Sequence, residues 1–307
     1  MKSRQLTPAE LDRYSRHILL PQVGVEGQRK LSASSALVVG AGGLGSAALA
    51  YLAGAGVGRL GIVDGDRVEL SNLNRQVIYP LSAVGRPKAE SARQAVEALN
   101  PACEVTAIVR RLTGETVRTA VRGWDVVLDC TDNFPTRFIV SDACWLEKVA
   151  LVTAAVQGFE GQLLTVLPGG ASPCYRCLIP EPPADRFVAA CGQAGVFGPA
   201  VGVLGTLQAV EAVKVLLGIG YGFERRLLAY DALKGRLRVL DRVADPACAL
   251  CGPDGCCTPA EAPSKPKRNS RGGQSCPPRG GQDCPPRESR SATEPETLRR
   301  KRGRKGR

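Results

Sequence analysis

A glycine-rich turn near residue 40 restricts the possible folds of this chain more than any other segment. Gly40, Gly42 and Gly45 follow a short apolar run in a G-x-G-x-x-G pattern and open a helix-like segment of small residues. Glycines at these positions let the backbone approach a phosphate closely, and the helix N-terminus favours its negative charge. Asp64 follows a second apolar run, where a carboxylate can accept hydrogen bonds from ribose hydroxyls. The pattern predicts a nucleotide-binding strand–turn–helix unit.

Apolar runs and helix-like segments alternate along most of the chain. Strands are expected at 37–40, 60–64, 125–130 and 151–156, separated by helices at 44–54, 88–99 and 136–147. Such alternation is typical of an α/β fold with a Rossmann-like, doubly wound and mostly parallel sheet. After residue 158 we expect the same sheet to continue, with strands at 162–167, 226–230 and 236–241 and a long helix at 199–217.

Composition divides the chain into three parts. Residues 1–30 are predicted to form a helical arm, residues 31–255 the α/β domain, and residues 256–307 a disordered basic tail. The tail is rich in Pro, Gly, Ser and Arg and nearly free of apolar residues, so it cannot offset its chain entropy by burial. It contains a short repeat, RGGQSCPP at 271–278 and RGGQDCPP at 279–286.

Most of the net charge of +12 belongs to this tail. Residues 264–307 hold 14 Lys and Arg against four Asp and Glu, which leaves the rest of the chain nearly neutral. The charge therefore allows nucleic-acid binding only through the tail. One interpretation of the tail is an electrostatic tether for RNA, an acidic partner or a membrane surface. The simpler interpretation is a solvated tail. Cys276 and Cys284 within it are candidates for redox chemistry or sulfur transfer.

The chain contains twelve cysteines but one histidine, His17. A histidine-rich metal site is therefore excluded, and so is a mechanism that needs several imidazoles. The first ten residues are polar, and no uninterrupted apolar stretch reaches the roughly 18–20 residues that a membrane span needs. We expect a cytoplasmic protein that contacts no membrane, in which the cysteines serve metal binding or thiol chemistry before disulfides.

Two cations favour a triphosphate over a dinucleotide. Arg75 ends a polar segment after Asp64, and Lys88 begins a helix. A triphosphate carries about four charges and must release pyrophosphate, so two cations suit it better than they suit a dinucleotide. Asp132 follows the strand at 125–130, at the sheet edge where ligands bind, and a carboxylate beside phosphates is typical of a Mg²⁺ site. The alternatives are solvated surface charge for the cations and a helix N-cap for Asp132.

Four cysteines form two C-x-x-C pairs, Cys174 with Cys177 and Cys248 with Cys251. Two such pairs can complete a tetrahedral site for one Zn²⁺, and a closed shell of four thiolates leaves no position for a substrate. The spacing predicts a structural zinc site that joins the two segments. Unrelated free thiols are the alternative, and a disulfide under aerobic conditions is another.

Cys191 stands between a proline-rich loop and a glycine-rich turn. A cysteine in a mobile loop is accessible, and it becomes a nucleophile when its thiolate is favoured. The alternative is a packing role at the entry to the following helix.

Many short segments resemble one enzyme family, in order along the chain. These segments are RYSRHILLPQVG (13–24), VVGAGGLGSAALAYLAGAGVG (38–58), SNLNRQ (71–76), VGRPKAESA (84–92), DCTDNFPTR (129–137), EGQL (160–163), PCYRCL (173–178), CGQAGVFGP (191–199) and CALCG (248–252). From about residue 6 to residue 252, the sequence resembles the ThiF/MoeB family of sulfur-carrier-protein adenylyltransferases. That family is related to the activating enzymes of ubiquitin-like proteins.

The resemblance implies roles for individual residues. Asp64 would hold the ribose, Asp132 would bind Mg²⁺, and Arg16 would reach the nucleotide of the neighbouring subunit in a homodimer. The simpler interpretation of Arg16 is a charge on an amphipathic arm. The implied nucleotide-binding set is Gly40, Gly42, Gly43, Gly45, Asp64, Ser71, Asn72, Arg75, Lys88, Asp132 and Asn133. The implied catalytic set is Arg16, Arg75, Lys88, Asp132 and Cys191, the last being where some members form a thioester or an acyl disulfide.

The implied function is ATP-dependent adenylation of the C-terminal Gly-Gly carboxylate of a small ubiquitin-like sulfur-carrier protein, with ATP, Mg²⁺ and Zn²⁺ as cofactors. No general base is needed, because a carboxylate is already ionised at neutral pH. Sulfur from a separate donor, a cysteine desulfurase or a rhodanese, would then displace AMP in molybdopterin, thiamine, thiolated-tRNA or cysteine synthesis. A rhodanese-like domain, which some relatives carry after the last C-x-x-C, is not expected in a tail this short and polar.

Three alternatives stay open at the level of sequence. A ubiquitin-like modifier-activating enzyme would form a stable thioester at Cys191. An NAD(P)-binding oxidoreductase would share the glycine turn but have no use for Arg75, Lys88 and Asp132 together. A non-catalytic scaffold would bind a ubiquitin-like partner, or RNA through its tail, without cleaving ATP.

Overall fold

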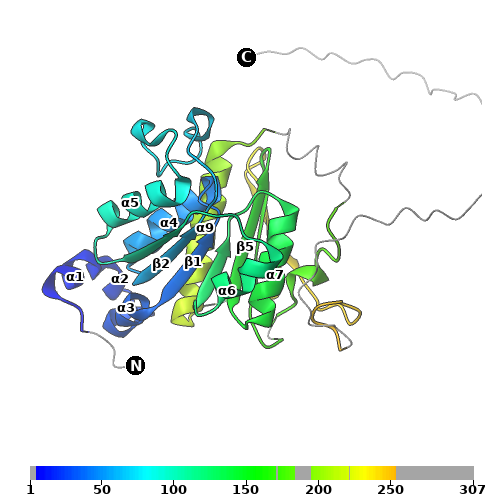
Figure 1. Cartoon of the computed structure of the whole chain (residues 1–307). Coiled ribbons are helices and arrows are strands. Elements are labelled where there is room, and N and C mark those ends of the chain that lie inside the picture. The colour runs from blue at the N-terminus through cyan, green and yellow to red at the C-terminus, as the bar shows by residue number, and fades with distance from the viewer. Residues whose placement is uncertain (1–4, 171, 184–194, 221, 254–307) are drawn as a thin grey trace, which may run out of the picture. The chain divides into compact units, whose positions relative to one another are not determined.

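An eight-stranded mixed sheet organises the described part of the chain (Figure 1), in the order β3-β2-β1-β4-β5-β6-β7-β8. The computed structural model describes residues 5–170, 172–183, 195–220 and 222–253. The strands are β1 (Ser35–Val39), β2 (Arg59–Val63), β3 (Glu104–Ile108), β4 (Val126–Asp129), β5 (Ala150–Gln157), β6 (Glu160–Val166), β7 (Arg226–Asp231) and β8 (Arg236–Asp241). β3, β2, β1, β4 and β5 pair in parallel, and β5 to β8 pair antiparallel.

The central strands of the parallel half are buried on both faces. Every residue of β1 and of β4 is buried. β1 lies between β2 and β4, with Val38 opposite Ile62 on one side and Leu128 on the other. Parallel strands need crossover connections, so helices cover both faces of the sheet and the strands read as continuous apolar runs. The predicted α/β, mostly parallel, doubly wound sheet is confirmed.

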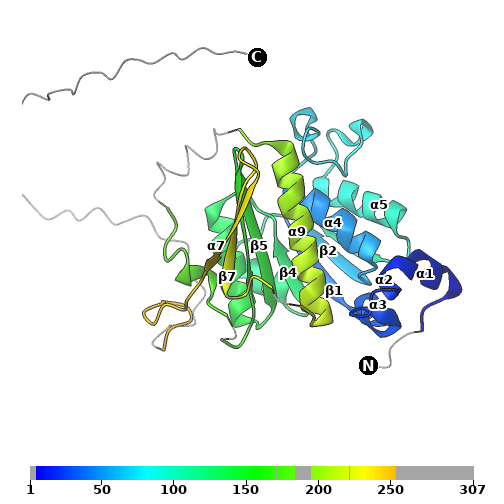
Figure 2. The same cartoon turned by 180° about the vertical axis from the view of Figure 1, so that it is seen from behind.

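Helices pack on both faces of the sheet (Figures 1 and 2). One face carries α4 (Gly43–Ala55), α5 (Lys88–Leu99) and α9 (Gly198–Leu217), and the other carries α6 (Gly114–Val121) and α7 (Phe134–Leu146). The first face buries a core that includes Leu49, Ile62 and Leu204. The second face buries a separate core that includes Leu37 and Phe138.

α9 lies against α4 and the sheet (Figure 2). By length and mean hydropathy (1.6) it could span a membrane, but Leu204, Ala209 and Ala212 are buried in the protein core. Gly205 lets the two helices approach closely, because a Cβ there would lie 2.4 Å from Leu44 O. The apolar composition of α9 is therefore explained by its burial between α4 and the sheet.

Within residues 5–34, three short helices precede β1 and pack against the α/β domain. They are α1 (Pro8–Arg13), α2 (Ser15–Ile18) and α3 (Gly24–Ala33). Asn100 Nδ2 donates to Tyr14 Oη at 2.9 Å, and Gln28 Nε2 donates to Ala55 O at 2.9 Å. Because α3 continues past residue 30, a single residue, Ser34, separates the helical arm from β1.

β3 and α6 were not predicted from the sequence. β3 is an edge strand with exposed Glu104 and Thr106 and only partly buried Val105 and Ala107. α6 has eight residues. Short and partly exposed elements carry little of the hydrophobic periodicity on which such predictions depend. The other expected strands and helices are present, with ends shifted by a few residues.

Candidate nucleotide site and metal centre

A cleft of about 1580 Å³ opens at the carboxyl ends of the parallel strands. Val39, Val63 and Cys130 line it, at or just after the ends of β1, β2 and β4. β1 pairs with β2 on one side and with β4 on the other, so the strand order reverses here. Open α/β sheets bind ligands at such a switch point, because the connections on its two sides diverge.

The glycine turn joins β1 to α4 at this cleft. Gly40 has φ +92°, and a Cβ there would lie 2.8 Å from Cys130 O. A Cβ on Gly45 would lie 2.0 Å from Gly40 O, so the third glycine lets the helix close against the strand. Gly42 is the N-cap of α4, and no side chain of the described residues caps the helix. The first N–H groups of α4 are therefore available to a phosphate.

Asp64 follows β2 and fixes the turn. Its two carboxylate oxygens accept hydrogen bonds from the N–H groups of Ala41 and Asp66, each at 2.8 Å. Burial raises the pKa of Asp64, and these two backbone hydrogen bonds oppose the rise. Each oxygen can accept a further bond, and the side chain lines the cleft. The geometry is therefore compatible with the predicted ribose contact.

Arg75 and Lys88 line the same cleft. Arg75 Nη1 donates to Ser71 O and to Asn74 Oδ1, each at 3.0 Å, and in the described part of the chain it forms no ion pair. Lys88 is only 7% exposed, with its Nζ 3.4 Å from Asp66 Oδ2. Charges held at low exposure interact more strongly with a ligand than charges in water. The two side chains therefore suit a polyanion.

Two further arginines, Arg110 and Arg111, line the cleft just after β3. Arg111 Nη2 lies 2.8 Å from Asp66 Oδ1, and this hydrogen bond lowers the pKa of Asp66. Neither arginine was predicted from the sequence, because β3 was not predicted. The short alternation of polar and apolar residues over 104–107 is the sequence signal that could have located them at the carboxyl end of a strand.

Asp132 and Asn133 lie between β4 and α7, at the cleft. Asn133 is the N-cap of α7, and its Oδ1 accepts from Thr136 N at 3.0 Å. The capping role considered for Asp132 therefore belongs to Asn133. The Asp132 carboxylate is exposed and accepts one long bond, 3.4 Å, from Asn133 Nδ2. It can thus reach a cation, and carboxylate oxygens are ligands that Mg²⁺ prefers.

Other predicted residues do not line the cleft. Gly45 packs against Gly40 O within the glycine turn. Ser71 and Asn72 form hydrogen bonds with Glu69 in their own short turn. Arg16 is exposed on α2 and lies outside the cleft of its own chain. Cys191 lies outside the described residues, as does the basic tail at 256–307.

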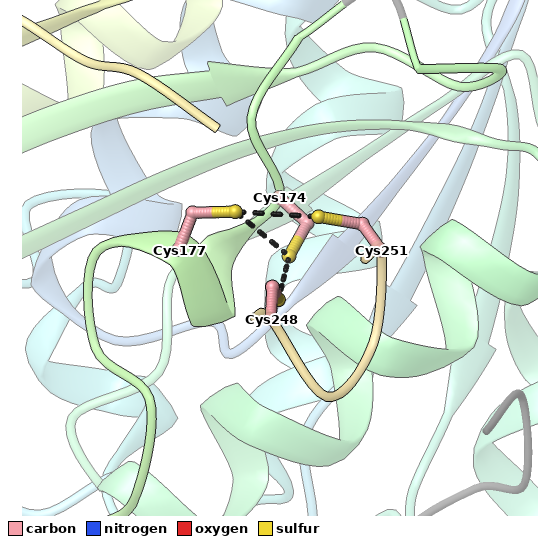
Figure 3. Close-up of side chains that lie close together, drawn as sticks. All are labelled: Cys174, Cys177, Cys248 and Cys251. Atoms are coloured by element: carbon pink, nitrogen blue, oxygen red, sulfur yellow. Dashed lines mark hydrogen bonds between the residues drawn. The ribbon is translucent and has the colours of Figure 1, made fainter. Parts of the chain in front are cut away.

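The four cysteines of the C-x-x-C pairs gather at one place (Figure 3). Their Sγ atoms all lie within 4.8 Å of one another, with Cys174 3.5 Å from Cys248 and Cys177 3.3 Å from Cys251. A tetrahedral site with Zn–S bonds of about 2.3 Å has S–S edges of about 3.8 Å. The donor set and its spacing therefore fit a metal ion, and the predicted four-cysteine metal-binding cluster is confirmed.

Two arginines lie beside this cluster. Arg176 pairs with Asp142 at 2.7 Å. Arg242, just after β8, is 6% exposed and donates to Pro173 O at 2.8 Å and Cys174 O at 3.2 Å, with no carboxylate partner among the described residues. Burial lowers the pKa of Arg242, and the nearby cysteines oppose this. A metal ion bound by four thiolates carries net negative charge and would compensate the buried guanidinium.

The glycine turn, the carboxylate after β2 and the cations at the switch point define a nucleotide-binding α/β protein. Residues 14–250 match the ThiF family, and the chain belongs to that family. The resemblance seen in the sequence is therefore confirmed.

Several relatives match most of the described chain. A sulfur carrier protein adenylyltransferase of Thermus thermophilus is 50% identical over 250 residues, covering 80% of this chain and 92% of the relative. A SAMP-activating enzyme E1 of Haloferax volcanii is 47% identical, covering 81% and 92%. The adenylyltransferase and sulfurtransferase MOCS3 of Bos taurus is 49% identical, but the match spans 54% of it. The chain thus spans about half the length of the MOCS3 relatives.

Solved structures share the fold at low identity. E. coli MccB, crystallised with ATP, aligns with a TM-score of 0.69 and 22% identity, over 78% of this chain and 74% of MccB. At this identity the likeness concerns the fold alone.

Proposed function

We propose that this protein is an ATP-dependent adenylyltransferase that activates the C-terminal Gly-Gly carboxylate of a small ubiquitin-like sulfur-carrier protein. The observation that carries the proposal is one cleft that holds a nucleotide turn with cations and extends from it along β5, β6 and β7, where Ala155, Gly161 and Ala229 line it. We infer that the C-terminal segment of the carrier enters along this extension. The names of the Thermus and Haloferax relatives support the same activity.

The proposed reaction is an in-line displacement at the α-phosphorus of ATP. A carboxylate oxygen of the carrier forms the new P–O bond, the bond from the α-phosphorus to pyrophosphate breaks, and the products are an acyl-adenylate and pyrophosphate. The N–H groups at the start of α4 hold phosphate oxygens, and Arg75 and Lys88 stabilise charge on the leaving pyrophosphate. No residue needs to remove a proton, because the carboxylate is ionised at neutral pH.

Asp132 is the residue that would hold Mg²⁺. Asp132 is exposed at the cleft and follows β4. The neighbouring Asn133, and not Asp132, caps α7. A bound Mg²⁺ would neutralise phosphate charge. For the four-cysteine cluster we propose Zn²⁺, in a structural role, because four thiolates fill its tetrahedral shell.

The proposed assembly is a homodimer in which Arg16 serves the partner's nucleotide site. Arg16 is exposed on α2 and does not line the cleft of its own chain. A role at the nucleotide is therefore possible only from a second copy. The sulfur that displaces AMP would come from a separate donor, a cysteine desulfurase or a rhodanese, in the cytoplasm.

The proposal is tested by carrier-dependent exchange of radiolabelled pyrophosphate into ATP. Wild-type protein should exchange only when a Gly-Gly-terminated carrier is added, and Asp132→Ala should lose the activity about 100-fold or more. The exposed Asp12, on α1, supplies a matched control, and Asp12→Ala should keep it. A wild-type protein that shows no exchange with any Gly-Gly-terminated carrier of its host would refute the function.

A second function is favoured by the SAMP-activating relative. In that case the carboxyl group would pass from the adenylate to Cys191 as a thioester, with release of AMP. The experiment is electrophoresis without reductant after incubation with ATP and carrier. A band that disappears with thiol and in Cys191→Ala would support it, whereas exchange without such a band leaves adenylation as the function.

A further inference from the structure

A buried ion pair lies beneath the loop that carries Asp132. Asp129 ends β4 and is 0% exposed, and Arg137 on α7 is 5% exposed. Arg137 Nε lies 3.5 Å from Asp129 Oδ2. Burying two charges costs free energy of desolvation and does not by itself increase stability. A buried pair beside a ligand cleft is therefore a candidate for a functional role.

The pair holds the backbone of Thr131 from both sides. Asp129 Oδ1 accepts from Thr131 N at 3.0 Å and from Thr131 Oγ1 at 2.6 Å. Arg137 Nη2 donates to Thr131 O at 2.7 Å. Thr131 O belongs to the peptide group that joins Thr131 to Asp132. Arg137 therefore fixes the peptide plane from which the Asp132 side chain begins.

Asp129 is itself anchored by two other elements. Thr153 Oγ1, on β5, donates to Asp129 Oδ2 at 2.8 Å, and the two residues are partners in the parallel register. Gln208 Nε2, on α9, donates to Asp129 O at 2.8 Å. The hydrogen bonds that hold Thr131 are thus anchored to β5 and to α7 and α9, which lie on opposite faces of the sheet. Thr131 therefore has little freedom to shift.

We propose that Arg137, acting with Asp129, is a positioning residue that orients Asp132 toward a magnesium–nucleotide complex. This inference rests on the proposed function, which gives Asp132 its cation. Asn133 still caps α7 when Arg137 is lost, but the peptide before Asp132 is then held from one side only. A carboxylate that samples several orientations must be ordered when the cation binds, which weakens binding.

The test measures how much Mg²⁺ the protein needs to bind a non-hydrolysable ATP analogue, by calorimetry on the full chain. Arg137→Met should raise the Mg²⁺ concentration for half-maximal binding by about 10- to 100-fold. Arg137→Lys should raise it less, because an ammonium group can still donate to Thr131 O. In pyrophosphate exchange, KM for MgATP should rise in Arg137→Met while KM for the carrier stays unchanged.

A second, partly buried ion pair, which joins α7 to the segment at 175–177, provides the control. Asp142 and Arg176 lie 2.7 Å apart, with side chains 4% and 15% exposed, and neither lines the cleft. Arg176→Met should lower thermal stability without changing the Mg²⁺ requirement. If Arg137→Met behaves like Arg176→Met, the positioning role is wrong.

Should Arg137→Met fail to fold, Asp129→Asn keeps the side-chain volume and should show the same shift, and an unchanged Mg²⁺ requirement there overturns the inference. A wild type that binds MgATP but exchanges no pyrophosphate with any carrier refutes the proposed function alone. A wild type that does not bind MgATP refutes both.

Discussion

Lys88 illustrates how a single residue is prepared for an anionic ligand. It opens α5 and is 7% exposed, yet its nearest carboxylate, Asp66, lies at the long distance of 3.4 Å and is paired more closely with Arg111 at 2.8 Å. Burial of an ammonium group with a weak partner costs stability, and a phosphate would supply the stronger partner. In the proposed site, Lys88 would thus contribute to binding more than to the stability of the free protein.

Replacement of this lysine should separate activity from stability. Lys88→Met should lower carrier-dependent pyrophosphate exchange about 100-fold or more, because one cation at the leaving group is lost. The melting temperature should change little, because Asp66 keeps Arg111. Lys148, exposed two residues after the end of α7, is the control, and Lys148→Met should exchange at the wild-type rate. An exchange rate near wild type in Lys88→Met would remove Lys88 from the site.

At the scale of elements, the turn between β1 and α4 depends on a backbone contact that only glycine permits. A Cβ on Gly45 would lie 2.0 Å from Gly40 O, a clash with backbone that no rotamer relieves. By contrast, a Cβ on Gly54, in the last turn of the same helix, would meet nothing within 4 Å. The contact with Gly40 O therefore requires glycine at position 45, whereas no contact requires it at position 54.

Alanine substitutions at these two positions should have opposite effects. Gly45→Ala should destabilise the protein by about 1–3 kcal/mol through forced backbone shifts and weaken ATP binding with it. Gly54→Ala should stabilise it by roughly 0.4–1 kcal/mol, because alanine loses less entropy on folding. Chemical denaturation of the two variants measures both changes. Equal destabilisation would show that the turn geometry is not the cause.

The link between β8 and the metal centre makes a second prediction at this scale. The Arg242 guanidinium bridges the end of β8 to the first C-x-x-C pair through Pro173 O and Cys174 O. Arg242→Met should speed loss of the metal to a coloured chelator by about tenfold or more, because it removes a neighbouring positive charge and two hydrogen bonds. Arg238→Met, at an exposed site on β8, should release metal at the wild-type rate. Identical release rates in both variants would exclude charge compensation by Arg242.

For the whole molecule, the question is whether each site is built from two chains. Arg16 lies outside the cleft of its own chain, whereas Arg75, Lys88 and Asp132 line it. In a two-fold dimer, each arm would then complete the other subunit's site. In the proposed arrangement, one chain alone would therefore hold an incomplete site.

Mixing two inactive variants tests this arrangement. Arg16→Ala and Asp132→Ala should each be inactive in pyrophosphate exchange. Refolded together in equal amounts, they should recover about one quarter of wild-type activity, because half the dimers are mixed and each carries one complete site. No recovery, in a mixture shown by native mass spectrometry to contain the mixed dimer, would place Arg16 outside the partner's site.

Sequence alone was sufficient for the nucleotide turn, the parallel core and the four cysteines. These features depend on local geometry or on burial on both faces: glycine where backbone must approach backbone, continuous apolar runs where strands are covered twice, and C-x-x-C where two sulfurs share a metal. Each of these features leaves a pattern within a few residues of the sequence, and the family resemblance indicates the same features.

The tertiary structure decided what depends on distant partners. It placed Arg110 and Arg111 at the cleft through an edge strand whose alternation of polar and apolar residues spans only 104–107. It gave the capping of α7 to Asn133 and so left Asp132 without that role. It also joined Asp129, Thr131 and Arg137 into one support beneath that loop. Hydrogen bonds and ion pairs of this kind follow from side-chain positions across elements, which periodicity does not encode.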